Sequence, residues 1–262
     1  MCAARYANAP PASTPRYRVN PIIVIPSRMA STRLPGKPLS LIAGRPMILH
    51  VFDRAREADI GPVAVACADA EIADAVRAAG GIAVMTDPSL PSGSDRVHAA
   101  LAALDPQGAH DVVVNLQGDF PTVPPGQLRM VITPLSDPAF DIATLVTPIL
   151  SPEEAAAPQV VKAACAFERG RAVSAALYFS RAAIPAGEGP LWHHIGIYAY
   201  RRAALARFVS LPESPLERRE KLEQLRALEA GMRIACMRVE HGAFGVDTPA
   251  DLTRARAILE AS

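Results

Sequence analysis

Short apolar runs alternate with helical patterns through the first half of the chain. Runs rich in β-branched residues predict strands at residues 22–25, 63–67, 82–85 and 111–116. Apolar residues at helical spacing predict helices at residues 46–58, 70–79 and 94–104, and a further one that begins at Pro125. Because the strands are apolar throughout and do not alternate with polar residues, they predict a parallel sheet that is covered on both faces.

The pattern changes in the second half of the chain. Strands are expected at residues 140–149, 159–167, 176–183 and 194–201, with no helices between them. Such a series predicts an antiparallel addition to the sheet or a projecting ribbon. Helices are expected again at residues 215–230 and 249–259.

Nothing in the sequence divides the chain into independent parts. It has no internal repeat and no long linker, so we expect a single domain over residues 21–262. The first 20 residues are rich in Pro, Ala, Ser and Arg and are expected to form a flexible tail. An organelle-targeting peptide is the alternative interpretation of this tail.

Composition narrows the class of protein. Half of the 262 residues are hydrophobic, which excludes collagen, coiled coils and global disorder. The formal net charge of +1 gives no overall reason to bind nucleic acid, although the seven Arg and Lys residues that precede Asp53 leave a nucleic-acid arm as an alternative. The four cysteines form no C-x-x-C pair, and no apolar run reaches the roughly 18 residues that span a bilayer. We therefore expect a cytoplasmic protein with no nucleic-acid or membrane partner.

A cation-rich loop follows the first predicted strand. Residues 27–38 contain Arg28, Arg33 and Lys37 together with three hydroxyl side chains and one glycine. Fixed charges, hydroxyls and backbone N–H groups suit a polyphosphate, and ligands bind beyond the carboxyl ends of strands in such sheets. The loop is not a Walker motif, because Pro38 follows Lys37 and the upstream glycine is missing. It predicts a phosphate site, and a solvated basic loop is the alternative.

Two aspartates are candidates for a metal site. Asp119 directly follows the predicted strand at residues 111–116, and Asp247 precedes the helix expected at residues 249–259. Taken alone, Asp247 is a candidate N-cap for that helix. Mg²⁺ prefers one or two carboxylates together with phosphate oxygens and water, so two aspartates beside a cationic loop would suit it.

Eight short motifs are spread from about residue 20 to the end of the chain. They are residues 25–28 (IPSR), 31–38 (STRLPGKP), 92–96 (SGSDR), 114–119 (VNLQGD), 177–181 (LYFSR), 194–201 (HIGIYAYR), 220–226 (EKLEQLR) and 245–249 (GVDTP). In this order they resemble the sugar-acid cytidylyltransferases, most fully the 3-deoxy-manno-octulosonate cytidylyltransferase (CMP-Kdo synthetase) family. A collinear set of this kind is far more specific than any one of its motifs.

The resemblance implies both a fold and a reaction. The fold would be α/β, a Rossmann-like three-layer sandwich of the nucleotide-diphospho-sugar transferase type. Its sheet would be mainly parallel, with an antiparallel projecting ribbon that commonly makes a homodimer. The reaction would transfer CMP from CTP to the anomeric hydroxyl of 3-deoxy-D-manno-octulosonate (Kdo), giving pyrophosphate and CMP-Kdo for lipopolysaccharide synthesis.

The resemblance also implies roles for particular residues. Arg28, Arg33 and Lys37 would be catalytic and neutralise the triphosphate, while Asp119 and Asp247 would be catalytic and hold Mg²⁺, the expected cofactor. The implied substrate-binding residues are Ser94 and Arg96 beside cytosine and ribose, and Gln117, Arg181, His194, Tyr198, Glu223 and Gln224 in the sugar-acid pocket. Arg181 would be the partner of the sugar carboxylate.

One departure from the family pattern follows Asp119. The family usually has Glu-Pro at this point, whereas this chain has Phe120-Pro121. We expect the ring to disturb the outer shell of the metal, in which case Phe120→Glu would raise activity. Two alternatives therefore stay open: a cytidylyltransferase for a modified octulosonate such as 8-amino-Kdo, and a catalytically silent homologue that binds nucleotide.

Overall fold

The computed structural model describes residues 19–31 and 33–260. Most of the tail expected at residues 1–20 lies outside the described residues. The single domain expected over residues 21–262 stays a prediction. In the described part of the chain, no helix is long and apolar enough to cross a membrane.

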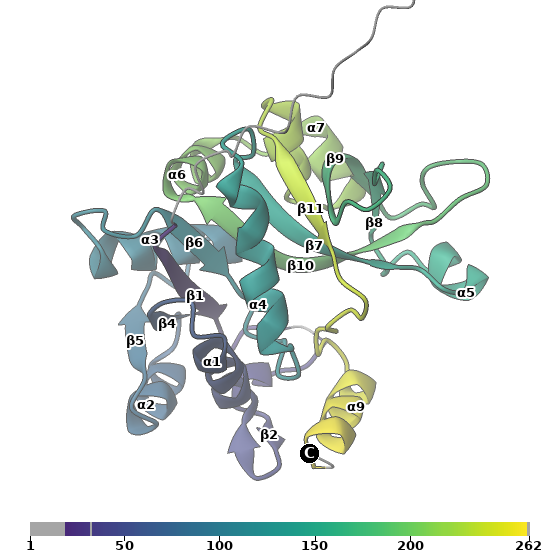
Figure 1. Cartoon of the computed structure of the whole chain (residues 1–262). Coiled ribbons are helices and arrows are strands. Elements are labelled where there is room, and N and C mark those ends of the chain that lie inside the picture. The colour runs from purple at the N-terminus through teal and green to yellow at the C-terminus, as the bar shows by residue number, and fades with distance from the viewer. Residues whose placement is uncertain (1–18, 32, 261–262) are drawn as a thin grey trace, which may run out of the picture.

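Nine strands of the described chain form one sheet, in the order β5-β4-β1-β6-β10-β7-β11-β9-β8 (Figure 1). Their bounds are β1 (Pro21–Ser27), β4 (Val63–Cys67), β5 (Ile82–Met85), β6 (Val112–Asn115), β7 (Ile142–Pro148), β8 (Lys162–Cys165), β9 (Val173–Ser180), β10 (Trp192–Arg201) and β11 (Ile234–Arg238). A separate two-stranded hairpin joins β2 (Leu41–Ile42) and β3 (Arg45–Pro46).

The sheet is mixed. β1 pairs in parallel with β4 and β6, and β5 extends the parallel part beyond β4. β10 runs antiparallel to both β6 and β7, and β11 lies parallel to β7. β9 and β8 complete the sheet with antiparallel pairs. Because β4, β1 and β6 are parallel neighbours, the loops that follow them meet at one edge of the sheet.

Helices cover both faces of the sheet. The α-helices are α1 (Met47–Glu57), α2 (Ala70–Ala78), α3 (Gly93–Leu104), α4 (Pro125–Ile132), α5 (Pro152–Ala156), α6 (Arg202–Ser210), α7 (Pro215–Glu220), α8 (Leu225–Glu229) and α9 (Pro249–Glu260), and the 3₁₀ turns are η1 (Lys37–Leu39) and η2 (Thr133–Ser136). Residues of α1, α2 and α4 pack with Ile23 and Ile25 of β1, whereas residues of α3, α6 and α8 pack with Ile22 and Val24. Successive strand side chains point to opposite faces, so β1 contributes to both cores. Figure 1 shows α1 and α4 crossing the near face of the sheet.

The second half differs from the sequence prediction at four elements. No helix was expected between the strands at residues 140–149 and 159–167, but α5 lies there, with Ser151 as its N-cap. The pattern did not predict α6, which begins at Arg202 directly after β10, with no Pro or Gly to mark the boundary. It also missed β11, a strand of five residues that lies between β7 and β9. The helix expected at residues 215–230 is two helices, because Lys221 has a φ of 58° and ends α7. Leu222, the next residue, is buried in the core, so packing supports this break.

The start of the sheet allows a test of its packing. A Cβ at Gly61 would lie 2.0 Å from the carbonyl oxygen of Pro21, the first residue of β1. We expect Gly61→Ala to lower the free energy of unfolding by about 1–3 kcal/mol, because backbone must shift to relieve the overlap. Gly126→Ala in α4 is the matched control, since its Cβ would meet only an arginine nitrogen at 4.0 Å. Urea unfolding measures both, and equal stabilities of the two variants would contradict the close approach.

Candidate active site

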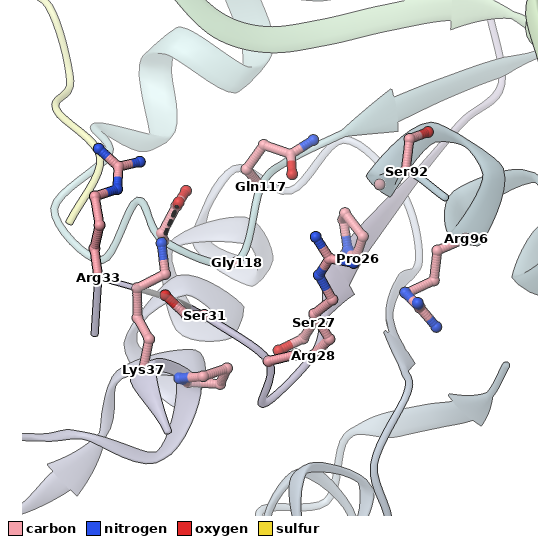
Figure 2. Close-up of a pocket in the computed structure, with 14 residues that line it drawn as sticks. Pro26, Ser27, Arg28, Ser31, Arg33, Lys37, Ser92, Arg96, Gln117 and Gly118 are labelled. Atoms are coloured by element: carbon pink, nitrogen blue, oxygen red, sulfur yellow. Dashed lines mark hydrogen bonds and ion pairs between the residues drawn. The ribbon is translucent and has the colours of Figure 1, made fainter. Parts of the chain in front are cut away.

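A cleft of about 350 Å³ opens at the edge of the sheet where β1 and β6 end. Its walls come from the loop after β1, the start of α3 and the loop after β6. The lining residues are Pro26, Ser27, Arg28, Ala30, Ser31, Arg33, Lys37, Pro38, Ser92, Gly93, Arg96, Gln117, Gly118 and Asp119. Figure 2 shows Arg28 between Lys37 on one side of the cleft and Arg96 on the other.

Local hydrogen bonds shape the cation-rich loop. The Met29 N–H donates to Asp69 Oδ2 over 2.8 Å, which ties the loop to the segment that follows β4. Gly36 has a φ of +68°, a left-handed conformation that glycine adopts without strain. This turn lets η1 begin at Lys37, whose N–H donates to the Leu34 carbonyl over 3.1 Å. The Lys37 side chain is thereby directed at the loop after β6.

Lys37 joins the two aspartates that lie 128 residues apart in sequence (247 − 119). Its Nζ lies 2.7 Å from Asp119 Oδ2 and 3.1 Å from Asp247 Oδ1. The backbone reinforces this meeting, because the Val246 N–H donates to the Asp119 carbonyl over 2.8 Å. Arg33 Nη2 lies 2.9 Å from the other oxygen of Asp247. The structure therefore brings both aspartates to one cation at the mouth of the cleft.

The charges of this group depend on one another. Burial lowers the pKa of Lys37, but the two carboxylates outweigh it, so the net shift is upward and the ammonium stays charged. Burial raises the pKa of Asp119, and the nearby Lys37 offsets this only in part. Asp119 Oδ1 is buried and has no hydrogen-bond partner within the described chain. A buried oxygen without a partner is costly, which marks this atom as open to a further cation or donor.

Asp247 is not the N-cap that its position suggests. The Asp251 N–H donates to Thr248 Oγ1 over 3.2 Å, and Asp251 Oδ2 accepts from the Thr248 N–H over 2.9 Å. Thr248 therefore caps α9. The carboxylate of Asp247 is left to pair with Lys37 and Arg33.

The other side of the cleft also carries positive charge. Arg96 is only 2% exposed, and its Nη1 donates to Thr86 Oγ1 over 2.6 Å and to the Asp87 carbonyl over 3.1 Å. Burial, with a smaller contribution from Arg28, lowers the pKa of Arg96. Within the described residues, Arg28 has no ion pair and Arg96 Nη2 has no hydrogen-bond partner. An anion with several oxygens would neutralise these cations.

A second cluster of substrate-binding candidates lies behind the cleft, with His194 and Gln224 buried and Tyr198 and Glu223 half-buried. His194, Tyr198, Glu223 and Gln224 come from β10 and from the segment between α7 and α8. Glu223 Oε1 and Gln224 Nε2 are buried without a hydrogen-bond partner in the described chain. The break after α7 places these two side chains here, since a continuous helix would carry them past the site.

Hydrogen bonds connect the cleft to this cluster. Gln117 Nε2 donates to Asn115 Oδ1 over 2.9 Å, and Asn115 Nδ2 donates to Ser94 Oγ over 3.4 Å. Ser94 Oγ then donates to Glu223 Oε2 over 3.2 Å. Tyr198 lies directly opposite Asn115 on the neighbouring strand. The cleft and the buried cluster therefore form one continuous polar site.

Burial disfavours the charged forms of the side chains in this cluster. It lowers the pKa of His194 to about 3, with a smaller contribution from His193. It raises the pKa of Tyr198 well above its usual value and also raises the pKa of Glu223. His194 and Tyr198 are consequently neutral near pH 7 and interact with ligands through hydrogen bonds.

Two predicted binding residues lie in unexpected surroundings. The guanidinium of Arg181 donates to the carbonyl oxygens of Pro158, Glu220 and Lys221, at 3.1, 2.8 and 3.2 Å. This geometry gives no support to Arg181 as partner of the sugar carboxylate, and instead it anchors the segment that leads to Glu223. Ser94 is buried against Glu223 and Asn115, so it lies behind the cleft wall that was expected to hold the base.

The ring of Phe120 is buried in the core with residues of α1 and α4. Its tip also lies beside the metal candidates, because a Cβ at Gly245 would be 3.7 Å from both Phe120 Cζ and Asp119 Oδ1. The effect of Phe120→Glu on activity stays a prediction, and the catalytically silent homologue stays an alternative.

Three polar residues of the site were not among the sequence candidates. Asn115 gave a usable signal, since it is a lone amide at the end of an apolar strand and is 1% exposed. Ser92 caps α3 by accepting from the Asp95 N–H over 3.2 Å, so the helix begins at Gly93, one residue before the start that the sequence pattern predicts. Thr144 gave no signal, because threonine is common in strands.

The depressed pKa of His194 predicts a pH dependence of stability. The pKa of His194 is about 3 in the folded chain and near 6.5 in the unfolded chain. The contribution of the neutral ring to folding stability is therefore complete above pH 6.5 and is lost as the pH falls toward 3. The free energy of unfolding should decline over this window with a slope of up to about 1.4 kcal/mol per pH unit from this group. His194→Gln should show a shallower decline in urea titrations between about pH 5 and 7. Identical slopes in the two proteins would contradict a buried, neutral His194.

Solved structures resemble this fold over most of the chain. One, of CMP:2-keto-3-deoxy-manno-octonic acid synthetase complexed with CTP, superposes with a TM-score of 0.85 at 41% identity and covers 92% of this chain and 99% of that one. Another, of 4-diphosphocytidyl-2C-methyl-D-erythritol synthase from Anaerococcus prevotii, has a TM-score of 0.60 at 13% identity and covers 91% of this chain and 98% of that one. The second likeness shows a shared fold only.

Sequence comparisons agree with the first structure. A cytidylyltransferase family model matches residues 22–234. The 3-deoxy-manno-octulosonate cytidylyltransferase of Rhodospirillum centenum is 64% identical over 241 residues, which cover 92% of this chain and 94% of that protein. The protein of the same name from Paramagnetospirillum magneticum is 60% identical over 243 residues, covering 93% and 99%. The chain belongs to the 3-deoxy-manno-octulosonate cytidylyltransferase family.

Proposed function

We propose that this protein transfers CMP from CTP to the anomeric hydroxyl of Kdo, with release of pyrophosphate, and so supplies CMP-Kdo for lipopolysaccharide synthesis. The observation that carries the proposal is the meeting of Lys37, Asp119 and Asp247 at a cation-rich cleft. The names of the relatives support the choice of nucleotide and sugar acid.

The cleft suits a nucleoside triphosphate. Arg28, Arg33 and Lys37 come from one loop and would neutralise the phosphate oxygens, with backbone N–H groups of the same loop as further donors. Arg96 and the start of α3 form the opposite wall and would lie beside the ribose and cytosine. The Nη2 group of Arg96 has no partner in the described chain and is available to a ligand.

The residues present fit a magnesium ion. Asp119 and Asp247 already converge on the ammonium of Lys37, and Asp119 Oδ1 is buried without a partner. Residues 19–31 and 33–260 contain no group of three or more His, Cys, Asp or Glu side chains that could hold a metal ion, so the two aspartates would share the ion with phosphate oxygens and water. A pair of carboxylates beside a phosphate site is the donor set that Mg²⁺ prefers. Asp119 and Asp247 would hold the ion, whose positive charge would offset phosphate charge and favour deprotonation of the attacking hydroxyl.

The buried cluster would hold the sugar acid. Kdo is rich in hydroxyls, and His194, Tyr198, Glu223 and Gln224 are side chains that can donate or accept hydrogen bonds. Binding would satisfy Glu223 Oε1 and Gln224 Nε2, which are otherwise buried and unpaired in the described chain. Gln117 lies between the cluster and the cleft, where the two substrates would meet.

The chemistry then requires alignment and neutralisation of charge. The anomeric oxygen attacks the α-phosphorus in line, the bond from this phosphorus to the bridging oxygen breaks, and pyrophosphate leaves with the electron pair. The hydroxyl proton passes to solvent, and we assign no separate general base. Lys37 and Arg33 would offset charge on the departing pyrophosphate. Holding the two substrates in contact supplies much of the remaining acceleration.

Three further properties belong to the same proposal. The fold would be of the nucleotide-diphospho-sugar transferase type, for which helices on both faces of one mixed sheet give support. A homodimer would form through the antiparallel strands, where Leu177 of β9 is 71% exposed. A cytoplasmic location fits the free thiols of Cys67, Cys165 and Cys236.

The reaction itself is tested by pyrophosphate release. Purified protein with CTP and Mg²⁺ should release pyrophosphate when Kdo is added, and CMP-Kdo should appear in equal amount. Parallel reactions with 8-amino-Kdo separate the modified-sugar alternative. No release with Kdo would overturn the proposal, and nucleotide binding without turnover on any sugar acid would favour the silent homologue.

The metal assignment predicts the effect of one substitution. Asp119→Asn keeps the shape of the side chain but removes its charge, so we expect kcat to fall about 10²–10³-fold with little loss of stability. Asp74→Asn is the matched control, because Asp74 lies on α2 in an exposed ion pair with Arg77. Wild-type turnover in Asp119→Asn would count against a metal held at this carboxylate.

A further inference from the structure

The hydroxyl of Thr144 lies at the centre of a small buried network behind the sugar-acid cluster. Thr144 is in β7 and is fully buried. Its Oγ1 lies 3.0 Å from His194 Nε2, 3.0 Å from the Ile195 carbonyl oxygen and 2.9 Å from the Ile197 carbonyl oxygen. All three partners belong to β10, the strand beside it.

A bulge in β10 creates this arrangement. The register of β10 against β7 shifts between Ile195, which is opposite Leu145, and Tyr198, which is opposite Thr144. Gly196 and Ile197 are the extra residues of the bulged strand. A bulge interrupts the ladder, and here the carbonyls of Ile195 and Ile197 turn to the Thr144 hydroxyl.

The partners determine which way the hydroxyl points. A carbonyl oxygen only accepts hydrogen bonds, so the single hydrogen of Thr144 Oγ1 is directed at the carbonyls of Ile195 and Ile197. Toward His194, Oγ1 therefore presents only its lone pairs, which accept a hydrogen bond. Nε2 must therefore carry a hydrogen and donate to Thr144.

His194 is neutral, because burial disfavours the charged ring. A neutral imidazole has one N–H, so a hydrogen on Nε2 leaves Nδ1 as a bare acceptor. Nδ1 has no hydrogen-bond partner among residues 19–31 and 33–260. Phe179 and Tyr198 hold the ring by edge and tilted contacts, at centroid distances of 5.0 and 5.4 Å.

We propose that Thr144 is a positioning residue that fixes His194 as the Nε2–H tautomer, so that Nδ1 accepts a hydrogen bond from a hydroxyl of the sugar acid. This inference rests on the proposed function for the identity of the ligand. The tautomer matters for recognition, because a bare nitrogen attracts a hydroxyl hydrogen and repels a carboxylate oxygen. Thr144 would thus help to determine which end of the sugar acid lies against β10.

The tautomer can be observed without any substrate. In protein labelled with ¹⁵N-histidine, long-range ¹H–¹⁵N spectra distinguish a protonated nitrogen from a bare one, and His194→Gln identifies the signals by removing them. We expect wild-type His194 to show a protonated Nε2 and a bare Nδ1 at about pH 7. A protonated Nδ1 in the wild-type protein would overturn the proposal, whatever the protein proves to catalyse.

Two variants then separate positioning from general packing. Thr144→Ser keeps the hydroxyl and should retain the tautomer, whereas Thr144→Val keeps the shape but should lose the single tautomer. In kinetic assays, Thr144→Val should raise KM for Kdo about three- to ten-fold, the loss expected for one misdirected hydrogen bond, with KM for CTP unchanged. Thr144→Ser should restore a KM near that of the wild type.

The outcomes are distinguishable from failure of the proposed function. Absence of Kdo turnover in the wild-type protein would overturn the function while the spectra still decide the tautomer. Equal increases in KM for CTP and Kdo, or an unchanged tautomer in folded Thr144→Val, would overturn the role of Thr144. If Thr144→Val does not fold, the wild-type spectrum and the Thr144→Ser variant still decide.

Discussion

The site depends on the two ion pairs that the ammonium of Lys37 makes with Asp119 and Asp247. Two carboxylates from distant parts of the chain, Asp119 and Asp247, repel each other, and a positive charge between them offsets that repulsion. Lys37 supplies that charge in the described chain. A triphosphate and a metal ion would add competing partners for all three groups, so the same arrangement that stabilises the folded chain also prepares it to exchange partners when substrate arrives.

Several buried polar atoms of the site have no hydrogen-bond partner in the described residues. Asp119 Oδ1, Arg96 Nη2, Glu223 Oε1 and Gln224 Nε2 are buried without partners in the described residues, and all lie in or behind one cleft. Each costs stability in the absence of ligand. These four atoms would be available to substrate, whereas Arg181 and Thr144 form hydrogen bonds that hold neighbouring backbone in position. The site thus contains some residues that would bind substrate and others that hold their neighbours in position.

Much of the fold followed from the sequence because local patterns specified it. The continuous apolar runs at β1, β4, β5 and β6 indicated a parallel sheet, and its geometry places the loops after β1 and β6 at one edge. The break at Lys221 and the strand β11 were missed, because each is decided by packing against elements far away in the sequence. Leu222 turns inward, and β11 is held between β7 and β9.

The sequence by itself determined which chemical groups the site contains: the cationic loop, the two aspartates and the collinear motifs of the family were all visible in it. It could not determine what each group touches. Only the tertiary structure decided that Lys37 lies between the aspartates, that Thr248 and not Asp247 caps α9, that Arg181 anchors backbone, and that Phe120 is in the core. The reason is physical: residue type sets charge and hydrogen-bonding capacity, whereas partnership depends on distances between segments that meet only after the sheet has formed.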